Sequence, residues 1–368
     1  MKQNLSMRIT ASVVSVVVLA FLVVLPHHAS ISQTQLWSQA LYIGVAAMGL
    51  NILTGYNGQV SLGHGAFFGI GAYTSAILIK SHGWQFLPTL AIAAALCFVV
   101  GMLVGFPALR VKGLYLALVT LGLAVVFPQL VNRYVPHDLC PTCTTSTISM
   151  TRVELAPPAW VPTSVSVIGR DDQWAYYVTL GALLIGLVVM VYLVRTRFGR
   201  ALIAVRDHEA AAETVGINIA QVKVLAFAIS ALYAGIAGSC SVLVDHTADG
   251  NSLKTFQLSI EFLVAVVIGG VATVVGPLIG AWIVVFLQHV IADLLPNWVG
   301  DTGLLHRVVG DPAASPAIFG LLLIFFVFVL PDGIVGGCKR LAAWMGRRWG
   351  RDVSAPPPAP SPLTNLTT

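Results

Sequence analysis

The chain has 368 residues, of which 57% are apolar and only 10% are charged, and its mean hydropathy is +0.86. A soluble domain has about 25% charged residues, so this composition excludes one and indicates an integral membrane protein. The formal net charge of +5 comes from loop residues. The sequence has no patch that combines basic and aromatic residues, so no nucleic-acid partner is expected.

Apolar windows long enough to cross the hydrocarbon core predict an all-α integral membrane protein with about ten transmembrane helices. The windows are 9–25, 36–53, 62–79, 86–106, 113–131, 175–194, 222–244, 258–275, 277–295 and 316–330. Two of them are weak, because the glycines of 62–79 suit a broken or re-entrant helix and 316–330 is short.

The basic residues predict the orientation, because short loops that carry Lys and Arg tend to stay in the cytoplasm. With the N-terminus inside, 14 of the 20 Lys and Arg residues fall on the cytoplasmic side. Both termini are therefore expected inside, in a multi-pass protein of the cell's inner (plasma) membrane. Residues 1–35 are interpreted as a retained anchor helix and an external turn, since Leu25-Pro26-His27-His28 is no small-residue cleavage site.

Two glycine-rich segments interrupt the apolar pattern. Gly65 and Gly69 form a GxxxG pair, a spacing that lets helix backbones approach closely in lipid. Gly55, Gly58 and Gly63 instead predict a break, which is tolerated at membrane depth only inside protein or along a cavity. A second interruption runs over 269–280. Paired interruptions of this kind point to a transport pathway, which we expect these two segments to flank.

Candidate residues for the substrate path or for helix packing lie in and near these segments. They are Gly63, His64, Gly65, Phe67, Phe68, Gly69, Tyr73, Tyr115, Glu261, Gly270 and Gly276. His64 suits either a packing hydrogen bond between helices or a role in the substrate path. The aromatic side chains could offer apolar surface to a hydrophobic substrate, or could simply face lipid and neighbouring helices.

Polar segments outside the spans are few. The external loop 132–173 contains Cys140 and Cys143, which could form a local disulfide, stay as free thiols or belong to a functional site. A lone CxxC lacks the further ligands of a metal site, and no metal is expected. The tail 336–368 is basic and then proline-rich, and it is expected to be disordered from about residue 354.

The sequence of the cytoplasmic loop 195–222 predicts a short helix. Strong helix formers follow Asp207, and Gly216 stands where a C-terminal cap is expected. Glu209 and Glu213 are four residues apart and share a face of that helix. Such a helix could dock another protein, or could be a solvated connector with no partner.

Four ordered motifs resemble the branched-chain amino-acid permease family of ABC importers, in its LivM type. The loop resembles the EAA-type coupling loop, through Phe198-Gly199, Ala201, Arg206-Asp207, Glu209, Ala211-Ala212-Glu213 and Gly216. The segments 61–73, 113–121 and 259–281 are similar to the family's SLGHAAFFGIGAY, GLYFALVTL and SIE…GG-x-GT-x-x-GP-x-x-GA. Departures are Gly65 for the first alanine, Ala272 for a usual glycine, and His208 where the family often has asparagine.

The resemblance implies a permease domain over 36–335 that passes branched-chain amino acids inward by alternating access. It also implies two ATPase subunits, a second related permease and an external binding protein around this chain, within membrane lipid. The implied ATPase-coupling residues are Arg206, Asp207, Glu209, Ala212, Glu213 and Gly216.

The residues themselves agree that the chain is not the ATPase, because it has no G-x-x-x-x-G-K-[ST] phosphate loop. No cofactor is expected on it, ATP and Mg being bound by partner subunits, and no catalytic residues are expected. Urea or short amides are alternative substrates. An ion-coupled secondary transporter is disfavoured, because the predicted midplane is nearly free of fixed charge.

Overall fold

The structure is a computed structural model, and it describes residues 17–291 except 111, 112, 141, 142, 144, 152, 159–170 and 250–254. Beyond residue 291 it describes only 320, 321, 324 and 333–337. The predicted span 316–330, the tail 336–368 and the start of the first predicted span therefore lie largely outside the described residues.

The described chain is almost entirely helical. After a helix at Val17–His28, the elements are α2 (Ile31–Asn51), the π-helical turn η1 (Ile52–Tyr56), α3 (His64–His82), α4 (Phe86–Ala108), α5 (Leu114–Tyr134), the π-helical turn η2 (Val135–Leu139), β1 (Ile148–Ser149), α6 (Asp171–Arg195), α7 (Arg197–Asp207), α8 (Glu209–Thr214), α9 (Ile219–Asp245), β2 (Thr247–Ala248), α10 (Thr255–Gly269) and α11 (Gly276–His289). By length and composition, five segments among the described residues could cross a membrane. They are Ile31–Tyr56, Phe86–Ala108, Tyr115–Tyr134, Asp172–Arg195 and Ile219–Asp245. A helical membrane protein is confirmed, whereas ten spans and their orientation stay predictions.

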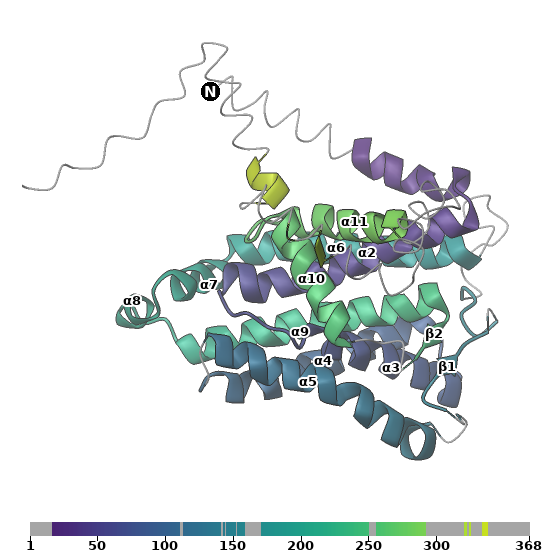
Figure 1. The fold of residues 1–368 in the computed structure, drawn as a ribbon, viewed down its shortest axis with the longest axis horizontal. Coiled ribbons are helices and arrows are strands. Elements are labelled where there is room, and N and C mark those ends of the chain that lie inside the picture. Colours follow the sequence, from purple (N-terminus) through teal and green to yellow (C-terminus); the bar gives the residue numbers. More distant parts are fainter. Residues whose placement is uncertain are drawn as a thin grey trace, which may run out of the picture.

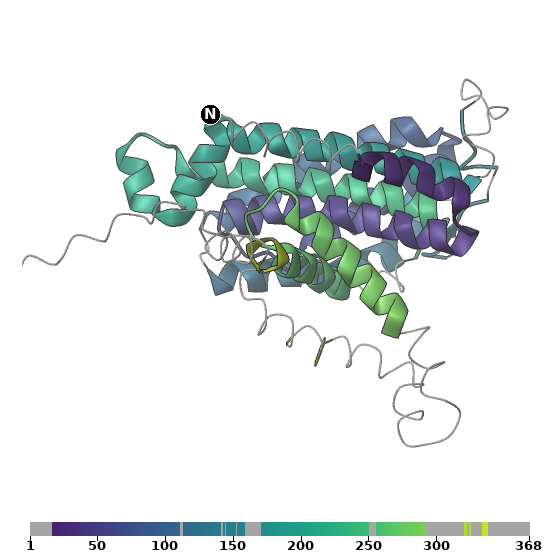
Figure 2. The ribbon, with the colours of Figure 1, turned by 90° about the horizontal axis from the view of Figure 1, so that it is seen from above.

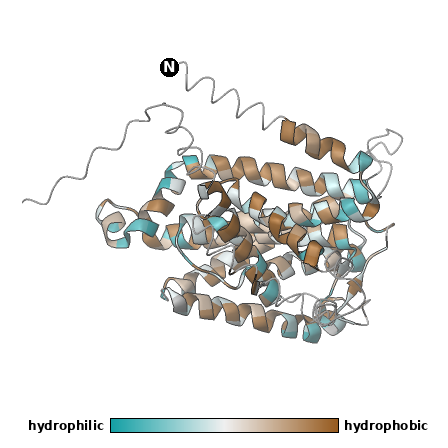
Figure 3. Ribbon diagram, turned by 45° about the horizontal axis from the view of Figure 1, so that its top comes forward, coloured by the Kyte–Doolittle hydropathy of each residue, from teal (hydrophilic) through white to brown (hydrophobic). Residues whose placement is uncertain are grey.

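The long helices lie side by side in a bundle with α9 near its centre (Figures 1 and 2). Helix α9 packs against α2, α3, α4 and α6. In the apolar windows of α2 and α9, 83% of the residues are buried, against 28% in α4 and α6. The outer helices expose apolar side chains such as Leu103, Phe106 and Ile185. Figure 3 shows brown, hydrophobic residues along the helices throughout the bundle. That arrangement suits a lipid surface, since a soluble monomer rarely exposes so continuous an apolar patch.

The first glycine-rich segment contains the predicted break. Helix α2 passes into the π-helical turn Ile52–Tyr56, and the chain is not helical from 57 to 63. Helix α3 then begins at His64 and runs unbroken for 19 residues, about 28 Å at 1.5 Å per residue. The break therefore lies at the start of the predicted span 62–79, and the described helix α3 is unbroken, while its crossing of the membrane stays a prediction.

The second interruption divides α10 from α11 earlier than the hydropathy windows placed it. Helix α10 ends at Gly269, and residues 270–275 form a turn before α11. The predicted span 258–275 therefore ends six residues too late, whereas the start of 277–295 agrees with α11 and its end lies outside the described residues. The described parts of the two helices, 15 and 14 residues, span about 22 Å and 21 Å, and α11 passes at its end into a π-helical pair at 290–291.

The predicted cytoplasmic and external loops lie at opposite ends of the bundle (Figures 1 and 2). Helices α7 and α8 project from one end. At the other end β1 pairs with β2 in an antiparallel ribbon, Ile148 opposite Ala248 and Ser149 opposite Thr247. The ribbon is a small exception to the all-α prediction. It ties the end of α9 to the segment that follows α5.

Candidate functional site

Helices α7 and α8 form a hairpin, called here the coupling hairpin (197–217), at one end of the bundle. Its second helix ends as the sequence predicted. Gly216 has φ +84°, its N–H donates to Glu213 O at 3.0 Å, and the N–H of Ile217 donates to Ala212 O at 3.1 Å. These two bonds satisfy carbonyls at the helix end in a Schellman arrangement, which needs the left-handed backbone that glycine adopts without strain.

The start of α8 differs from the prediction. Asp207 is the last residue of α7, and the extended residue His208, with φ −159°, precedes α8 in its place. Asp207 instead pairs with the neighbouring Arg206, whose Nη2 lies 2.9 Å from its Oδ1. Asp207 therefore orients the Arg206 guanidinium rather than capping the helix.

Arg206 joins the coupling hairpin to α2. Its Nη1 donates to the carbonyl oxygen of Gly55 at 3.0 Å, across 151 residues of sequence. Gly55 lies in the last turn of α2 and its π-helical extension, where carbonyls lack helical partners and the helix dipole is negative. A guanidinium is therefore well placed there both as a donor and as a charge.

Glu209 forms a second anchor, to α9. Its carboxylate pairs with the Nζ of Lys223, whose side chain is only 8% exposed, so an uncompensated charge there would be costly. Ala212 packs inward, and Glu213 stays exposed. Glu209 and Glu213 both line a groove of about 590 Å³ between α8 and the start of α9. The two glutamates therefore differ: one holds the hairpin, and one faces outward.

His64 lies in the packed interior, 1% exposed. Its Nε2 is 2.9 Å from the carbonyl oxygen of Ala46, which can only accept, so Nε2 carries the proton. Its Nδ1 lies 3.4 Å from the Ser230 hydroxyl. His64 thus links α3 to α2 and α9, which favours the packing interpretation over a place in the substrate path.

Each glycine near the start of α3 allows a different neighbouring group to pack closely against it. A Cβ on Gly63 would lie 2.5 Å from Thr120 O in α5, and one on Gly65 would lie 2.0 Å from Thr255 O in α10. A Cβ on Gly69 would lie 2.3 Å from the Phe127 ring in α5. The GxxxG pair therefore permits close packing, as expected, but against two helices rather than one.

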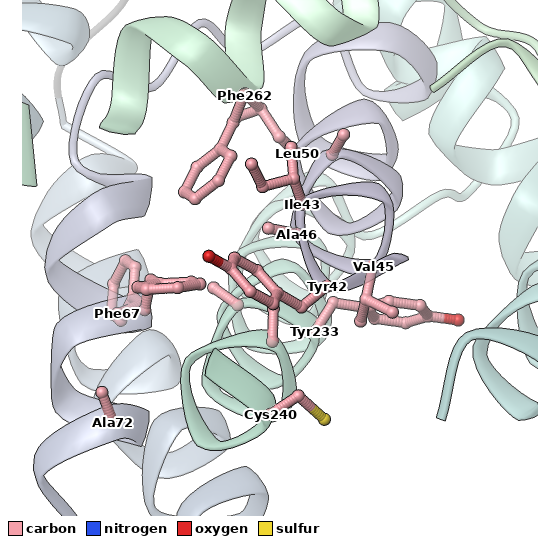
Figure 4. Packing of buried hydrophobic residues seen from close by; sticks show 14 of the residues in the cluster. Tyr42, Ile43, Val45, Ala46, Leu50, Phe67, Ala72, Tyr233, Cys240 and Phe262 are labelled. Carbon is pink, nitrogen blue, oxygen red and sulfur yellow. The ribbon is translucent and has the colours of Figure 1, made fainter. Parts of the chain in front are cut away.

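Three of the predicted aromatic residues lie inside the bundle. Phe67, Phe68 and Tyr73 are at most 4% exposed. The Phe68 ring lies 5.5 Å from Phe262 of α10 and 5.9 Å from Tyr42 of α2, centroid to centroid. Figure 4 shows such side chains of α2, α3, α9 and α10 converging on one interior region.

Tyr73 and Tyr115 lie apart from this region. The Tyr73 hydroxyl donates to Ser146 O at 2.8 Å, near the β1–β2 ribbon. Tyr115 is 71% exposed on α5, so the structure does not bring it together with the other candidates.

The candidates on α10 and α11 frame the second interruption. Glu261 is 8% exposed and accepts from Gln257 Nε2 at 3.1 Å. Gly270 has φ +119°, and the N–H of Gly276 donates to the Thr273 hydroxyl at 3.1 Å. The turn 270–275 is thus closed by its own polar groups, one of which, Thr273, was not among the candidates.

Sequence reasoning missed Asn51. This residue is fully buried at the end of α2, and its side chain forms two hydrogen bonds with the turn 270–275. A Cβ on Gly55 would also lie 2.7 Å from the Ala272 nitrogen. The two interrupted segments therefore touch each other. An amide inside an apolar window was the available signal, because a buried polar group needs a partner.

The structure joins Cys140 to Cys143 in a disulfide, which favours the local structural bond among the three alternatives. Cys140 is fully buried and Cys143 nearly so. Within the described residues, no group of three or more His, Cys, Asp or Glu side chains could hold a metal ion.

Comparison with known proteins identifies the family. Residues 33–327 match the model of the family described as branched-chain amino acid transport system / permease component. The chain is 31% identical over 272 residues to the high-affinity branched-chain amino acid transport system permease protein LivM of Escherichia coli K12, covering 69% of this chain and 62% of that protein. LivM of Salmonella typhimurium is 30% identical, over the same 69% of this chain and 62% of its own length. The chain therefore matches less than two thirds of the length of each of these two relatives.

More distant relatives carry other names. The E. coli K12 permease LivH is 22% identical over 79% of this chain and 90% of its own length. The ribose import permease RbsC of E. coli K12 is 30% identical, over 36% of this chain and 38% of its own. No solved structure matches the chain. Because the family match covers most of its length and the resemblance to the LivM type is confirmed, this chain belongs to the branched-chain amino acid transport permease family.

Proposed function

We propose that this chain is a permease subunit of an ABC importer, in the inner membrane, that moves branched-chain amino acids inward by alternating access. The coupling hairpin is the observation that carries the proposal. It projects from one end of the bundle, is anchored to α2 through Arg206 and to α9 through Glu209, and presents Glu213 to solvent. Two anchors on two different helices let a force applied to the hairpin reach the bundle.

The ATPase subunits would dock on this hairpin, in contact with Glu213 and the groove beside it. Binding and hydrolysis of ATP would displace the hairpin, and the anchored helices α2 and α9 would follow. Packed cores change between discrete arrangements rather than deforming continuously, so this displacement would alternate the access of a central path. A second related permease would complete the pore, and a binding protein would deliver substrate at the end that carries the β1–β2 ribbon.

The interior near Phe67 and Phe68 would offer apolar surface to a hydrophobic side chain on this path. In the structure these rings are packed, so the path would be closed in this state. The relatives' names support branched-chain amino acids as cargo. Urea or short amides stay the alternative, and competition experiments separate them.

Uptake by the reconstituted complex tests this function. The chain is co-expressed with its candidate ATPases, paired permease and binding protein, placed in liposomes, and assayed for leucine uptake with and without internal ATP. We expect uptake that requires ATP and that excess isoleucine or valine, but not urea, competes away. Uptake by this chain alone on an ion gradient, indifferent to ATP, would replace the importer with a secondary transporter.

A charge reversal tests the hairpin as the docking surface. Glu213→Arg should reduce copurification of the ATPases and ATP-driven uptake together. It replaces a negative charge on the proposed docking surface by a positive one, which would repel or leave unpaired the groups of the ATPase that contact Glu213. The matched control is Arg133→Glu, at an exposed position in the last turn of α5 at the opposite end of the bundle. Equal loss in both variants would argue against docking at Glu213.

A further inference from the structure

Asn51 joins the end of α2 to the turn between α10 and α11. Its Nδ2 donates to the carbonyl oxygen of Thr273 at 2.7 Å, and its Oδ1 accepts from the N–H of Ala272 at 2.9 Å. The two bonds pair one side-chain amide with two consecutive backbone groups, more than 220 residues away in sequence. Only an amide of this length supplies both a donor and an acceptor here, since aspartate lacks the donor and leucine lacks both.

The turn that Asn51 holds is conformationally strained. Ala272 has φ +58°, a left-handed backbone that costs a residue with a Cβ about 1–2 kcal/mol. Such strain persists only where the surroundings over-determine the conformation. The paired bonds from Asn51 provide that restraint, so the shape of the turn depends on the position of the end of α2.

Gly55 connects this clamp to the coupling hairpin. Its carbonyl accepts from Arg206, while a Cβ on it would lie 2.2 Å from Asn51 Oδ1 and 2.7 Å from the Ala272 nitrogen. One residue of the π-helical turn therefore lies against the guanidinium on one side and against Asn51 and the strained turn on the other. A glycine is required for this double contact.

A polar cavity lies beside the hydrogen bond between Arg206 and Gly55. The cavity, about 170 Å³, is lined by the end of α7, by the segment 57–60 and by Lys223 among others, while Gly58 of that segment lies against Arg206. The side-chain amide of Asn57 has no protein partner among the described residues. The hairpin thus has room to move here, and Arg206 is its direct bond to the π-helical turn.

We propose that Arg206, Gly55 and Asn51 form a relay that transmits movement of the coupling hairpin to the α10–α11 turn. Asn51 acts in it as a positioning residue. Displacing Arg206 pulls the last turn of α2, the Asn51 clamp shifts with it, and the turn carries α10, whose Phe262 packs on Phe68 of α3. The inference rests on the proposed function, in which ATPase subunits move the hairpin. The Glu209 anchor acts differently, because it pulls on the long, buried helix α9.

The ratio of ATP hydrolysed to leucine imported tests the relay. In the reconstituted complex, Asn51→Leu and Asn51→Asp should still hydrolyse ATP, but this ratio should rise by about tenfold, the size expected for losing such paired bonds. The control is Thr34→Val, which removes a part-buried hydrogen bond from the Thr34 hydroxyl to the carbonyl oxygen of Ser30, the N-cap residue of α2. A wild-type ratio in Asn51→Leu would overturn the relay.

A second measurement does not depend on how well the Asn51 variants assemble. Val271 in the turn is 50% exposed, so a cysteine there, in a Cys338→Ser background, can be labelled by a polar thiol reagent. Nucleotide binding should change the labelling rate severalfold in the otherwise wild-type complex, and Arg206→Gln should abolish that change. An unaltered nucleotide response in Arg206→Gln would contradict the relay.

Failure of the relay and failure of the importer are distinguishable. A wild-type complex whose uptake ignores ATP refutes the proposed function, and the relay falls with it. ATP-driven uptake that keeps its wild-type ratio in Asn51→Leu refutes the relay alone.

Discussion

Gly71 of α3 and Gly235 of α9 lie backbone against backbone. A Cβ on Gly71 would be 2.2 Å from the carbonyl oxygen of Gly235 and 2.5 Å from its Cα. In lipid, helix association relies on van der Waals contact rather than on a hydrophobic driving force, and small residues permit the closest approach. This contact therefore fixes how near α3 lies to the central helix.

Adding one methyl group at this contact should destabilise the bundle. Gly71→Ala meets backbone atoms, which cannot rotate away, so α3 and α9 must separate at a cost of about 1–3 kcal/mol. Thermal unfolding of the protein in detergent should show a lower midpoint. Gly122→Ala on α5, where a Cβ meets nothing within 4 Å, is the control and should leave the midpoint unchanged or raise it. Equal midpoints for the two variants would contradict close packing at Gly71.

Local sequence signals could predict much of this fold. Runs of apolar residues located the long helices, and glycine next to polar residues located the break after α2. Gly216 located the end of α8, because a Schellman cap depends on residues within one turn of the chain. The family resemblance added the prediction that the loop 195–222 docks another subunit, a role that local signals alone left open between docking and a solvated connector.

Contacts between distant segments could not be predicted in this way. The GxxxG pair indicated close packing, but composition does not say that Gly65 meets α10 and Gly69 meets α5. Asn51 was missed because its partners lie on a turn remote in sequence. The end of α10 was misplaced because apolar residues in the turn, such as Val271, extend the hydropathy window across it.

Replacing Ala272 with glycine should stabilise the turn 270–275. Its φ of +58° is unfavourable for alanine and free for glycine, so Ala272→Gly should gain about 1 kcal/mol. Ala281→Gly is the matched control of opposite sign, because this buried residue lies inside α11 and glycine there costs about 1 kcal/mol. Thermal midpoints should move up for the first and down for the second. A lower midpoint for Ala272→Gly would mean that strain at this residue is negligible.

Acidic pH should weaken the end of the molecule that carries the β1–β2 ribbon. The backbone N–H of Thr151 donates to Glu154 Oε2 at 2.7 Å, and Lys80 Nζ lies 2.9 Å from Oε1, which together hold the pKa of Glu154 below its ordinary value. A lowered pKa means that these contacts stabilise the fold above the ordinary pKa and that their contribution is lost as pH falls through the folded value. The side chains are 30% exposed, so the effect should stay below about 1 kcal/mol.

The comparison of Glu154→Gln with the wild type across pH measures this effect. Near neutral pH the variant should unfold at a slightly lower temperature, and in acid the two should coincide because both side chains are then uncharged. Lys80→Met should give a smaller difference, since the Thr151 contact survives. A difference that persists unchanged in acid would rule out the charge on Glu154 as its cause.

The Cys140–Cys143 disulfide should be present in the purified protein and should stabilise only its own end of the bundle. Of the five cysteines, three should react with a thiol reagent in denaturant without reductant, and all five after reduction. The closed loop is short, so its entropic contribution is about 2 kcal/mol. Part of the turn survives reduction, because the N–H of Cys143 donates to Cys140 O at 2.9 Å. Reduction should therefore expose the segment between η2 and β1 to proteases while the helix content stays constant. Five reactive thiols before reduction would show that the pair is not oxidised.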